Sequence, residues 1–102
     1  MILYEVTLHV ELPLVHQVEE HMRQSHIPAI FTTGCFQRIR FYQAAPDRFR
    51  TSYEAATQRD LDRYFRDHAP GLRNEFTTFF PTGVSISRET WVLREVWGQV
   101  LS

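Results

Sequence analysis

Lysine is absent from this 102-residue sequence, whose eleven basic residues are all arginines. Arginine forks bind carboxylates and phosphates, but a G/C-rich coding bias is the simpler explanation. Cysteine is nearly absent as well, because Cys35 is the only one and has no partner for an internal disulfide. The fold is therefore expected not to depend on an oxidising compartment.

Excess charge and long apolar runs are also missing. The net charge is −1, which gives no electrostatic attraction to nucleic acids or anionic lipids. No apolar run approaches the roughly twenty residues of a membrane-spanning helix. Residues 1–5 lack the basic start of a signal peptide. We therefore expect a cytoplasmic, bacterial-type protein without a nucleic-acid or membrane partner.

The chain does contain enough apolar and aromatic residues for a packed core, at 43% and 14% of the sequence. Its length and composition predict one domain over residues 1–102. Two segments resemble each other: His26-Ile27-Pro28 followed by Phe31-Thr32-Thr33, and His68-Ala69-Pro70 followed by Phe76-Thr77-Thr78. They predict two β-α-β halves, each with a histidine near a proline bend in its helix.

The first half begins with alternating apolar and polar residues over 2–12. A period of two predicts a strand with one face in the core. Apolar residues then recur every four positions, which predicts an amphipathic helix over 14–34. Since a proline disfavours helical geometry in the residue before it, Pro28 acts against a helical Ile27. We expect a kink or break near His26.

Three patterns define the rest of the chain. Strand-like runs at 35–45 and 48–55 are joined by a short turn, which implies an antiparallel hairpin. A capping pattern then begins an amphipathic helix over 57–79. The run 84–97 is strand-rich, but its alternation slips around 88–90. There we expect either a bulge or a strand that extends past its own sheet to meet a partner.

The resulting order, β-α-β-β-α-β, predicts an α+β fold of the ferredoxin-like type. Right-handed crossovers place both helices on one face of a four-stranded antiparallel sheet. The other face is polar and uncovered, which is typical of a surface that binds a partner or a ligand. On this face we expect Glu5, Thr7, His9, Arg38, Arg40, Arg50 and Glu54.

Three segments carry a family resemblance: Ile2-Leu3-Tyr4-Glu5-Val6-Thr7, His26-Ile27-Pro28 with Thr33-Gly34-Cys35-Phe36, and residues 64–72 (YFRDHAPGL). They resemble a small uncharacterised bacterial family, a domain of unknown function in the dimeric α/β-barrel branch of ferredoxin-like folds. The resemblance implies a homodimer in which two sheets pack face to face and enclose a cavity. The wider superfamily includes cofactor-free monooxygenases, haem-processing enzymes, lactone isomerases and regulatory ligand-binding domains. The resemblance brings no catalytic residue with it.

His9, His26 and His68 are the candidates for catalysis, since imidazole transfers protons near neutral pH. A structural alternative fits His26 and His68 better, because a ring N–H there would satisfy a carbonyl that the nearby proline frees. Cys35 has no identifiable base beside it and is expected to be a packing residue. We expect no cofactor, and the sequence leaves enzymatic activity open.

The ligand-binding candidates are charged residues of the uncovered sheet face: Glu5, His9, Arg38, Arg40, Arg50 and Glu54. Lining a dimer cavity, they would bind a polar ligand, because buried charges are costly unless paired. An ion-paired dimer interface or a solvated face is the alternative. No metal site is expected, because His16, His21 and His26 are spaced by five and each turns about 140° from the last around an α-helix.

Other classes of protein fit less well. RNA-recognition modules share this order of elements, but residues 48–53 lack the glycine-aromatic motif that such modules need. The sequence contains no phosphate-binding loop, nucleophile elbow or dinucleotide fingerprint. Three functions stay open: a protein that binds a small organic acid or aromatic ligand, a cofactor-independent enzyme of the monooxygenase or isomerase type acting on small aromatic or polyketide-like compounds, and a purely structural or interaction dimer.

Overall fold

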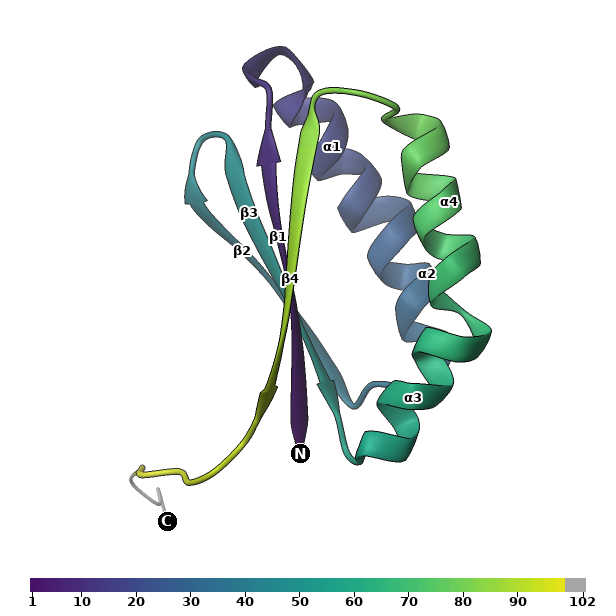
Figure 1. The fold of residues 1–102 in the computed structure, drawn as a ribbon. Coiled ribbons are helices and arrows are strands. Elements are labelled where there is room, and N and C mark those ends of the chain that lie inside the picture. The colour runs from purple at the N-terminus through teal and green to yellow at the C-terminus, as the bar shows by residue number, and fades with distance from the viewer. Residues whose placement is uncertain (99–102) are drawn as a thin grey trace.

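Four strands form one sheet in a computed structural model that describes residues 1–98 (Figure 1). The strands are β1 (Ile2–Val10), β2 (Arg38–Ala45), β3 (Arg48–Ala55) and β4 (Val84–Val92). They lie in the order β2-β3-β1-β4, and every pair of neighbours is antiparallel. This confirms the predicted four-stranded antiparallel sheet. The expected single domain also spans residues 99–102, which lie outside the described residues.

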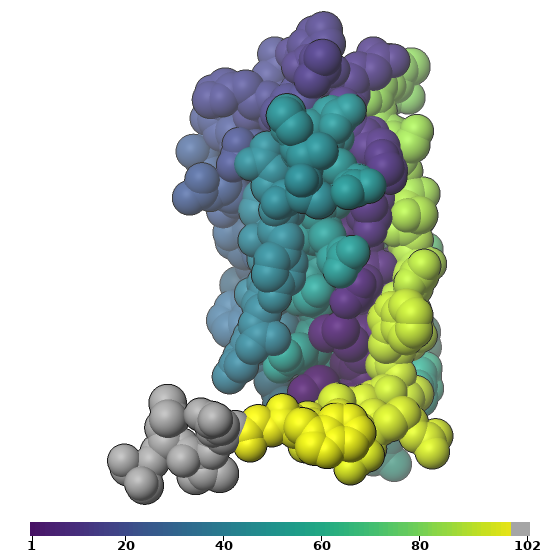
Figure 2. Space-filling view, turned by 90° about the vertical axis from the view of Figure 1, so that its left-hand side faces the viewer, coloured from purple at the N-terminus to yellow at the C-terminus, as the bar shows by residue number. Residues whose placement is uncertain are grey.

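Two helical arms connect the strands and cover only one face of the sheet (Figure 1). The first arm contains the 3₁₀ turn η1 (Leu12–Leu14), α1 (Val15–His21), the π-helical segment η2 (Met22–His26) and α2 (Ile27–Phe31). The second arm contains α3 (Gln58–Asp67) and α4 (Ala69–Phe79). The α+β, ferredoxin-like order β-α-β-β-α-β is therefore confirmed. Figure 2 shows the opposite, open face, where no helix covers the strands.

The first arm passes Pro28 without the predicted departure from helical geometry. Of the expected kink or break near His26, the break is absent, because His26 and Ile27 both keep right-handed helical angles. Instead, the Ile27 N–H donates to the Met22 carbonyl, five residues earlier, which defines a π turn. In a regular α-helix, the ring of Pro28 would clash with the carbonyl four residues earlier. The wider π turn shifts the carbonyls out of that arrangement.

The second arm does break, at His68. Its start is capped as predicted, because the Thr57 hydroxyl oxygen accepts a hydrogen bond from the Asp60 N–H at 3.2 Å. His68 then has φ −125° and ψ −41°, between α3 and α4. Pro70 lies in the first turn of α4, where its missing N–H costs no helical hydrogen bond. The predicted single helix is thus two helices separated at one residue.

The last strand is more regular than its sequence indicated. β4 pairs with β1 without a break, from Val84 opposite Val10 to Val92 opposite Ile2, so the predicted bulge is wrong. The register shifts instead in β2, between Gln43 and Ala45. Residues 93–98 continue past the sheet, where they lie across the lower end of the open face (Figure 2).

The core lies between the sheet and the helical arms. The alternation of β1 is confirmed, because Ile2, Tyr4, Leu8 and Val10 are buried on the helical side. Cys35 is 2% exposed among them, in the loop before β2, in agreement with a packing residue. Within residues 1–98, no helix is long and apolar enough to cross a membrane.

Candidate ligand cavity

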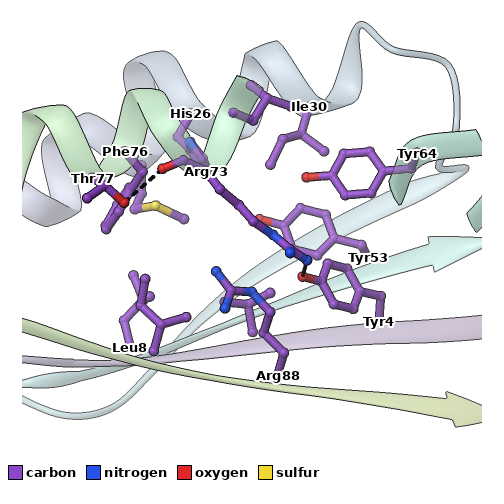
Figure 3. A pocket seen from close by; sticks show the side chains of 14 residues that line it. Tyr4, Leu8, His26, Ile30, Tyr53, Tyr64, Arg73, Phe76, Thr77 and Arg88 are labelled. Carbon is purple, nitrogen blue, oxygen red and sulfur yellow. Dashed lines mark hydrogen bonds between the residues drawn. The ribbon is translucent and has the colours of Figure 1, made fainter. Parts of the chain in front are cut away.

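A small cavity lies between the sheet and the helical arms, on the side of the edge strand β4 (Figure 3). Its volume of about 40 Å³ has room for roughly three water molecules. The lining contains polar and aromatic side chains set among aliphatic ones: Tyr4, Val6, Leu8, Met22, His26, Ile30, Tyr53, Tyr64, Leu72, Arg73, Phe76, Thr77, Ile86 and Arg88. No carboxylate is among these lining residues.

Three tyrosines form one end of the cavity. Tyr4 of β1, Tyr53 of β3 and Tyr64 of α3 are each exposed by 4% or less. The Tyr4 ring centroid lies 5.7 Å from that of Tyr53 and 6.2 Å from that of Tyr64. Burial raises the pKa of Tyr53 and of Tyr64 above the ordinary value. Both hydroxyls are therefore neutral at neutral pH and available as hydrogen-bond donors.

Two arginines lie at the opening of the cavity. Arg73, on α4, donates from Nη2 to the Tyr4 hydroxyl oxygen at 3.3 Å and stacks over Phe65, 5.8 Å from its ring centroid. Arg88 is paired with Val6 of β1, so its side chain leaves β4 on the helical face. Figure 3 shows both guanidinium groups between the helices and the sheet. Neither forms an ion pair with a carboxylate of residues 1–98.

His26 forms part of the cavity wall on the helical side. Burial lowers the pKa of His26 to about 4, and the positive charge of Arg88 acts in the same direction, whereas Glu75 opposes the shift. The ring is therefore neutral at neutral pH. Its Nδ1 is buried without a hydrogen-bond partner, so it does not satisfy a freed carbonyl as the structural interpretation expected.

The three histidines proposed as catalytic candidates lie in three different places. His9 is exposed on the open face of β1, and His26 lines the cavity. His68 is half-buried at the break between α3 and α4, with its ring centroid 6.5 Å from that of Tyr64, and it is not part of the cavity lining. The structure does not bring these residues together into one constellation.

Four of the six residues proposed to bind a ligand form ion pairs with one another on the open face. Arg40 Nη1 lies 3.0 Å from Glu54 Oε1, and Arg50 Nη1 lies 3.7 Å from Glu5 Oε2. These four also line an open groove of about 500 Å³, which the residues after β4 border. The other two, His9 and Arg38, are exposed on the same face and do not line the groove.

Sequence reasoning missed Arg73 and Arg88. The alternation of β4 runs through Val84 and Ile86 on the helical face, and Arg88 occupies the next position on that face. The slip in alternation predicts either a bulge or a strand that extends past its sheet, but at this position it marks a charged side chain that lines the cavity. Arg73 gave no comparable signal, because an arginine beside the apolar stripe of a helix looks like any solvated residue.

Comparisons with known proteins support the same fold. The profile of a family described as a domain of unknown function (DUF4286) matches residues 1–96. No curated protein matches the sequence. Among solved structures, a candidate antibiotic biosynthesis monooxygenase from Deinococcus radiodurans is 12% identical, with a TM-score of 0.70 over 98% of this chain and 99% of that one.

Two further structures show how widely the fold is shared. An ethyl tert-butyl ether d (ethd) family protein from Bacillus halodurans is 10% identical, with a TM-score of 0.67 over 87% of this chain and 97% of that one. A dimeric ferredoxin-like protein from an uncultured marine organism is 11% identical, with a TM-score of 0.62 over 97% of this chain and 100% of that one. At such identities the similarity establishes the fold alone.

Proposed function

The chain belongs to the DUF4286 family of domains of unknown function, and from its cavity we propose that it binds a small organic anion within each subunit of a homodimer. The observation that carries this proposal is the pair Arg73 and Arg88 at the opening of a cavity without a carboxylate in its lining. Arg73 and Arg88 are both exposed, and neither is paired with a carboxylate of residues 1–98, so each keeps N–H donors free for a ligand. An anion from outside would supply the missing counter-charge.

The lining limits the chemistry of the ligand. A carboxylate or enolate between the two guanidinium groups would receive charge-assisted hydrogen bonds. The tyrosine hydroxyls, which Figure 3 shows directed into the cavity, would donate further hydrogen bonds. The volume of about 40 Å³ admits a head group and little more. We therefore infer a monocarboxylate or enolate whose anionic end enters and whose remainder lies at the opening.

The open face is the second location considered for a ligand, and its charges favour a different use. Arg40 and Arg50 already have carboxylate partners there. Large apolar side chains lie exposed at the end of β4 and beyond it: Trp91, Val92, Leu93, Val96 and Trp97. Paired charges beside exposed aromatic residues suit contact with a second copy of the chain. We propose this face as the homodimer interface.

A cofactor-independent enzyme is the alternative, and similarity in fold to a candidate antibiotic biosynthesis monooxygenase favours it. His26 is the only imidazole in the cavity lining. Its pKa of about 4 makes it a weak base, whereas efficient proton transfer needs a pKa near the working pH. Ligand binding is therefore the better-supported function. If the protein turned over a small phenolic compound and His26→Gln abolished that turnover, enzymatic activity would become the better-supported function.

The binding proposal is tested by titrating the protein with acetate, propionate and benzoate while following amide chemical shifts by NMR. We expect Arg88→Met and Arg73→Met each to weaken binding by about tenfold or more, the value of one charge-assisted hydrogen bond. Arg50→Met, on the open face, is the matched control and should leave affinity unchanged. Loss of binding in the control alone would move the site to the open face, and no binding in any form would favour a purely structural dimer.

A further inference from the structure

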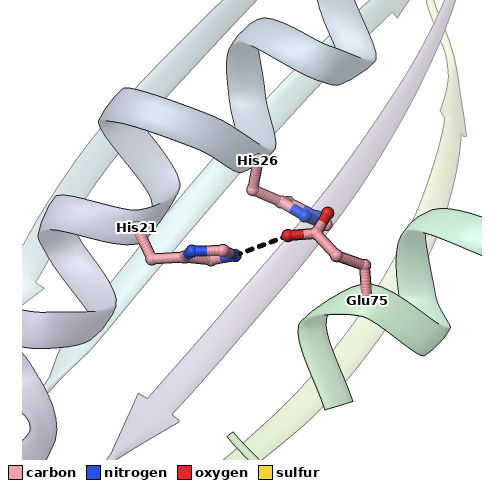
Figure 4. Close-up of side chains that lie close together, drawn as sticks. All are labelled: His21, His26 and Glu75. Carbon is pink, nitrogen blue, oxygen red and sulfur yellow. Dashed lines mark ion pairs between the residues drawn. The ribbon is translucent and has the colours of Figure 1, made fainter. Parts of the chain in front are cut away.

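Three potential metal ligands converge between the two helical arms, beside the cavity. They are His21 of α1, His26 at the end of η2, and Glu75 of α4 (Figure 4). One nitrogen of each histidine and a carboxylate oxygen all lie within 4.8 Å of one another. His21 Nε2 is the nearest to the acid, 3.1 Å from Glu75 Oε1. The five-residue spacing of the histidines, taken as α-helical, predicts no such cluster.

The π-helical segment explains why the two histidines meet. Five residues separate His21 from His26, and in a regular α-helix that spacing would turn their side chains about 140° apart. The residues from Met22 to His26 form a π turn, in which each turn takes more residues and positions five apart come closer to alignment. Their ring centroids are consequently 6.2 Å apart, with planes inclined by 32°. π turns in helices often occur at functional sites.

Two nitrogens in this cluster lack the partners that buried polar atoms normally have. His21 Nε2 and His26 Nδ1 are both buried without a hydrogen-bond partner, and the contact of His21 with Glu75 does not have hydrogen-bond geometry. The His21 side chain is only 8% exposed. Its ring is surrounded by those of Phe76, Phe79 and Phe80, whose centroids lie 4.4–6.0 Å away. These side chains contain no atom that could form a hydrogen bond with it.

We propose that His21, His26 and Glu75 bind a divalent transition-metal ion, with Zn²⁺ as the best match. Two imidazoles and one carboxylate form a recurrent zinc ligand set that leaves a fourth position open to water or another small ligand. The two nitrogen donors exclude Mg²⁺ and Ca²⁺, which prefer oxygen ligands.

The geometry requires only a small adjustment to close around the ion. Zinc takes its ligands at about 2.0–2.2 Å, so donor atoms of a tetrahedral site lie roughly 3.3–3.6 Å apart. The most widely separated pair of ligand atoms must therefore approach by at most about 1.5 Å. Glu75, whose side chain is 35% exposed, can supply that movement by rotation. The site does not depend on the proposed anion, although His26 belongs to both.

The competing explanation is an ion pair alone, in which protonated His21 holds α1 against α4 through Glu75. Titration of chelator-treated protein with Zn²⁺ by calorimetry, and with Co²⁺ by visible absorption, separates the two. We expect one ion per chain and a Co²⁺ spectrum of a tetrahedral site. Substitution of a residue that only hydrogen-bonds to a metal ligand weakens metal binding by about 10–100-fold. His21→Gln and Glu75→Gln, which remove a ligand atom, should each weaken it by about 100-fold or more.

His16→Gln is the matched control, because His16 is an exposed histidine on the same helix. It should leave the Zn²⁺ affinity unchanged. Circular dichroism of each metal-free variant establishes that the fold persists, and Glu75→Gln keeps the volume of the side chain if a histidine variant unfolds. Any of three results would overturn the proposal. Zn²⁺ binding would be lost in His16→Gln, it would survive in Glu75→Gln, or the wild type would not bind Zn²⁺ at all.

Discussion

Two arginines on the open face have carboxylate partners, whereas the two that line the cavity have none. On the open face, Arg40 lies 3.0 Å from Glu54 and Arg50 lies 3.7 Å from Glu5. Below the helical arms, Arg73 and Arg88 line a cavity that has no carboxylate. Charges that are already paired suit a contact surface, whereas cations without a counter-charge suit a site for an anion. The number of arginines on a face therefore says less about function than the carboxylates beside them.

The largest difference between the faces should appear in stability. Phe76, on the helical side, is 5% exposed and contacts the ring of His26 at a centroid distance of 5.3 Å. Phe76→Ala should lower the free energy of unfolding by about 3–5 kcal/mol, because it leaves a cavity in the core. Urea denaturation measures the loss.

Tyr42→Ala is the matched change on the open face, where Tyr42 is 49% exposed. It should cost less than about 1 kcal/mol if that face is in contact with water, in line with other surface substitutions. Beneath a second subunit, as the homodimer proposal requires, the loss should be larger and should depend on protein concentration. A small loss at every concentration would contradict the homodimer.

A smaller effect follows from the burial of His26 on the helical side. Burial lowers its pKa from 6.5 to about 4, so between these values the unfolded chain binds a proton that the folded chain does not. Stability should therefore fall as the pH drops from about 6.5 to 4, then level off with respect to this group. The shift corresponds to about 3 kcal/mol.

Urea denaturation at pH 7 and pH 4.5, in the presence of a chelator, measures the contribution of His26. His26→Gln removes the titrating group, so its stability should fall by about 2–3 kcal/mol less than that of the wild type over this interval. His9→Gln is the control, because His9 is exposed on the open face. Equal pH dependence in the wild type and His26→Gln would show that His26 titrates normally.

Local patterns in the sequence predicted the sheet and its two faces well. The alternation in β1 depends on a period of two within one strand, and Ile2, Tyr4 and Leu8 are buried as that period requires. The fold class, the order of elements and the open face followed from such patterns. The family resemblance pointed to the same fold, which the similarity to solved structures supports.

The cavity and the histidine cluster were not predictable, because both depend on contacts between elements far apart in the chain. Arg73 meets Tyr4 across 69 positions, and no local pattern links them. His21 and His26 meet only because a π turn replaces the α-helical geometry from which their spacing was judged. Pro28 marks the place of that turn in the sequence, but a proline indicates an irregularity without specifying which kind.

The smallest expected effect is the coupling energy between the ion-paired residues of the open face. Its size shows whether a second subunit covers that face. Arg40 is 46% exposed in its side chain and Glu54 is 11% exposed. Between solvated partners a double-mutant cycle with Arg40→Met and Glu54→Gln should give a coupling of about 0.2–1 kcal/mol. Beneath a second subunit the pair loses its water, and breaking it by one substitution should cost about 3–5 kcal/mol. Light scattering of the wild type and both variants at tens of micromolar shows whether the measured coupling belongs to a monomer or to a dimer. A monomer with weak coupling would contradict the homodimer, whereas a dimer that Glu54→Gln weakens would identify this face as its interface.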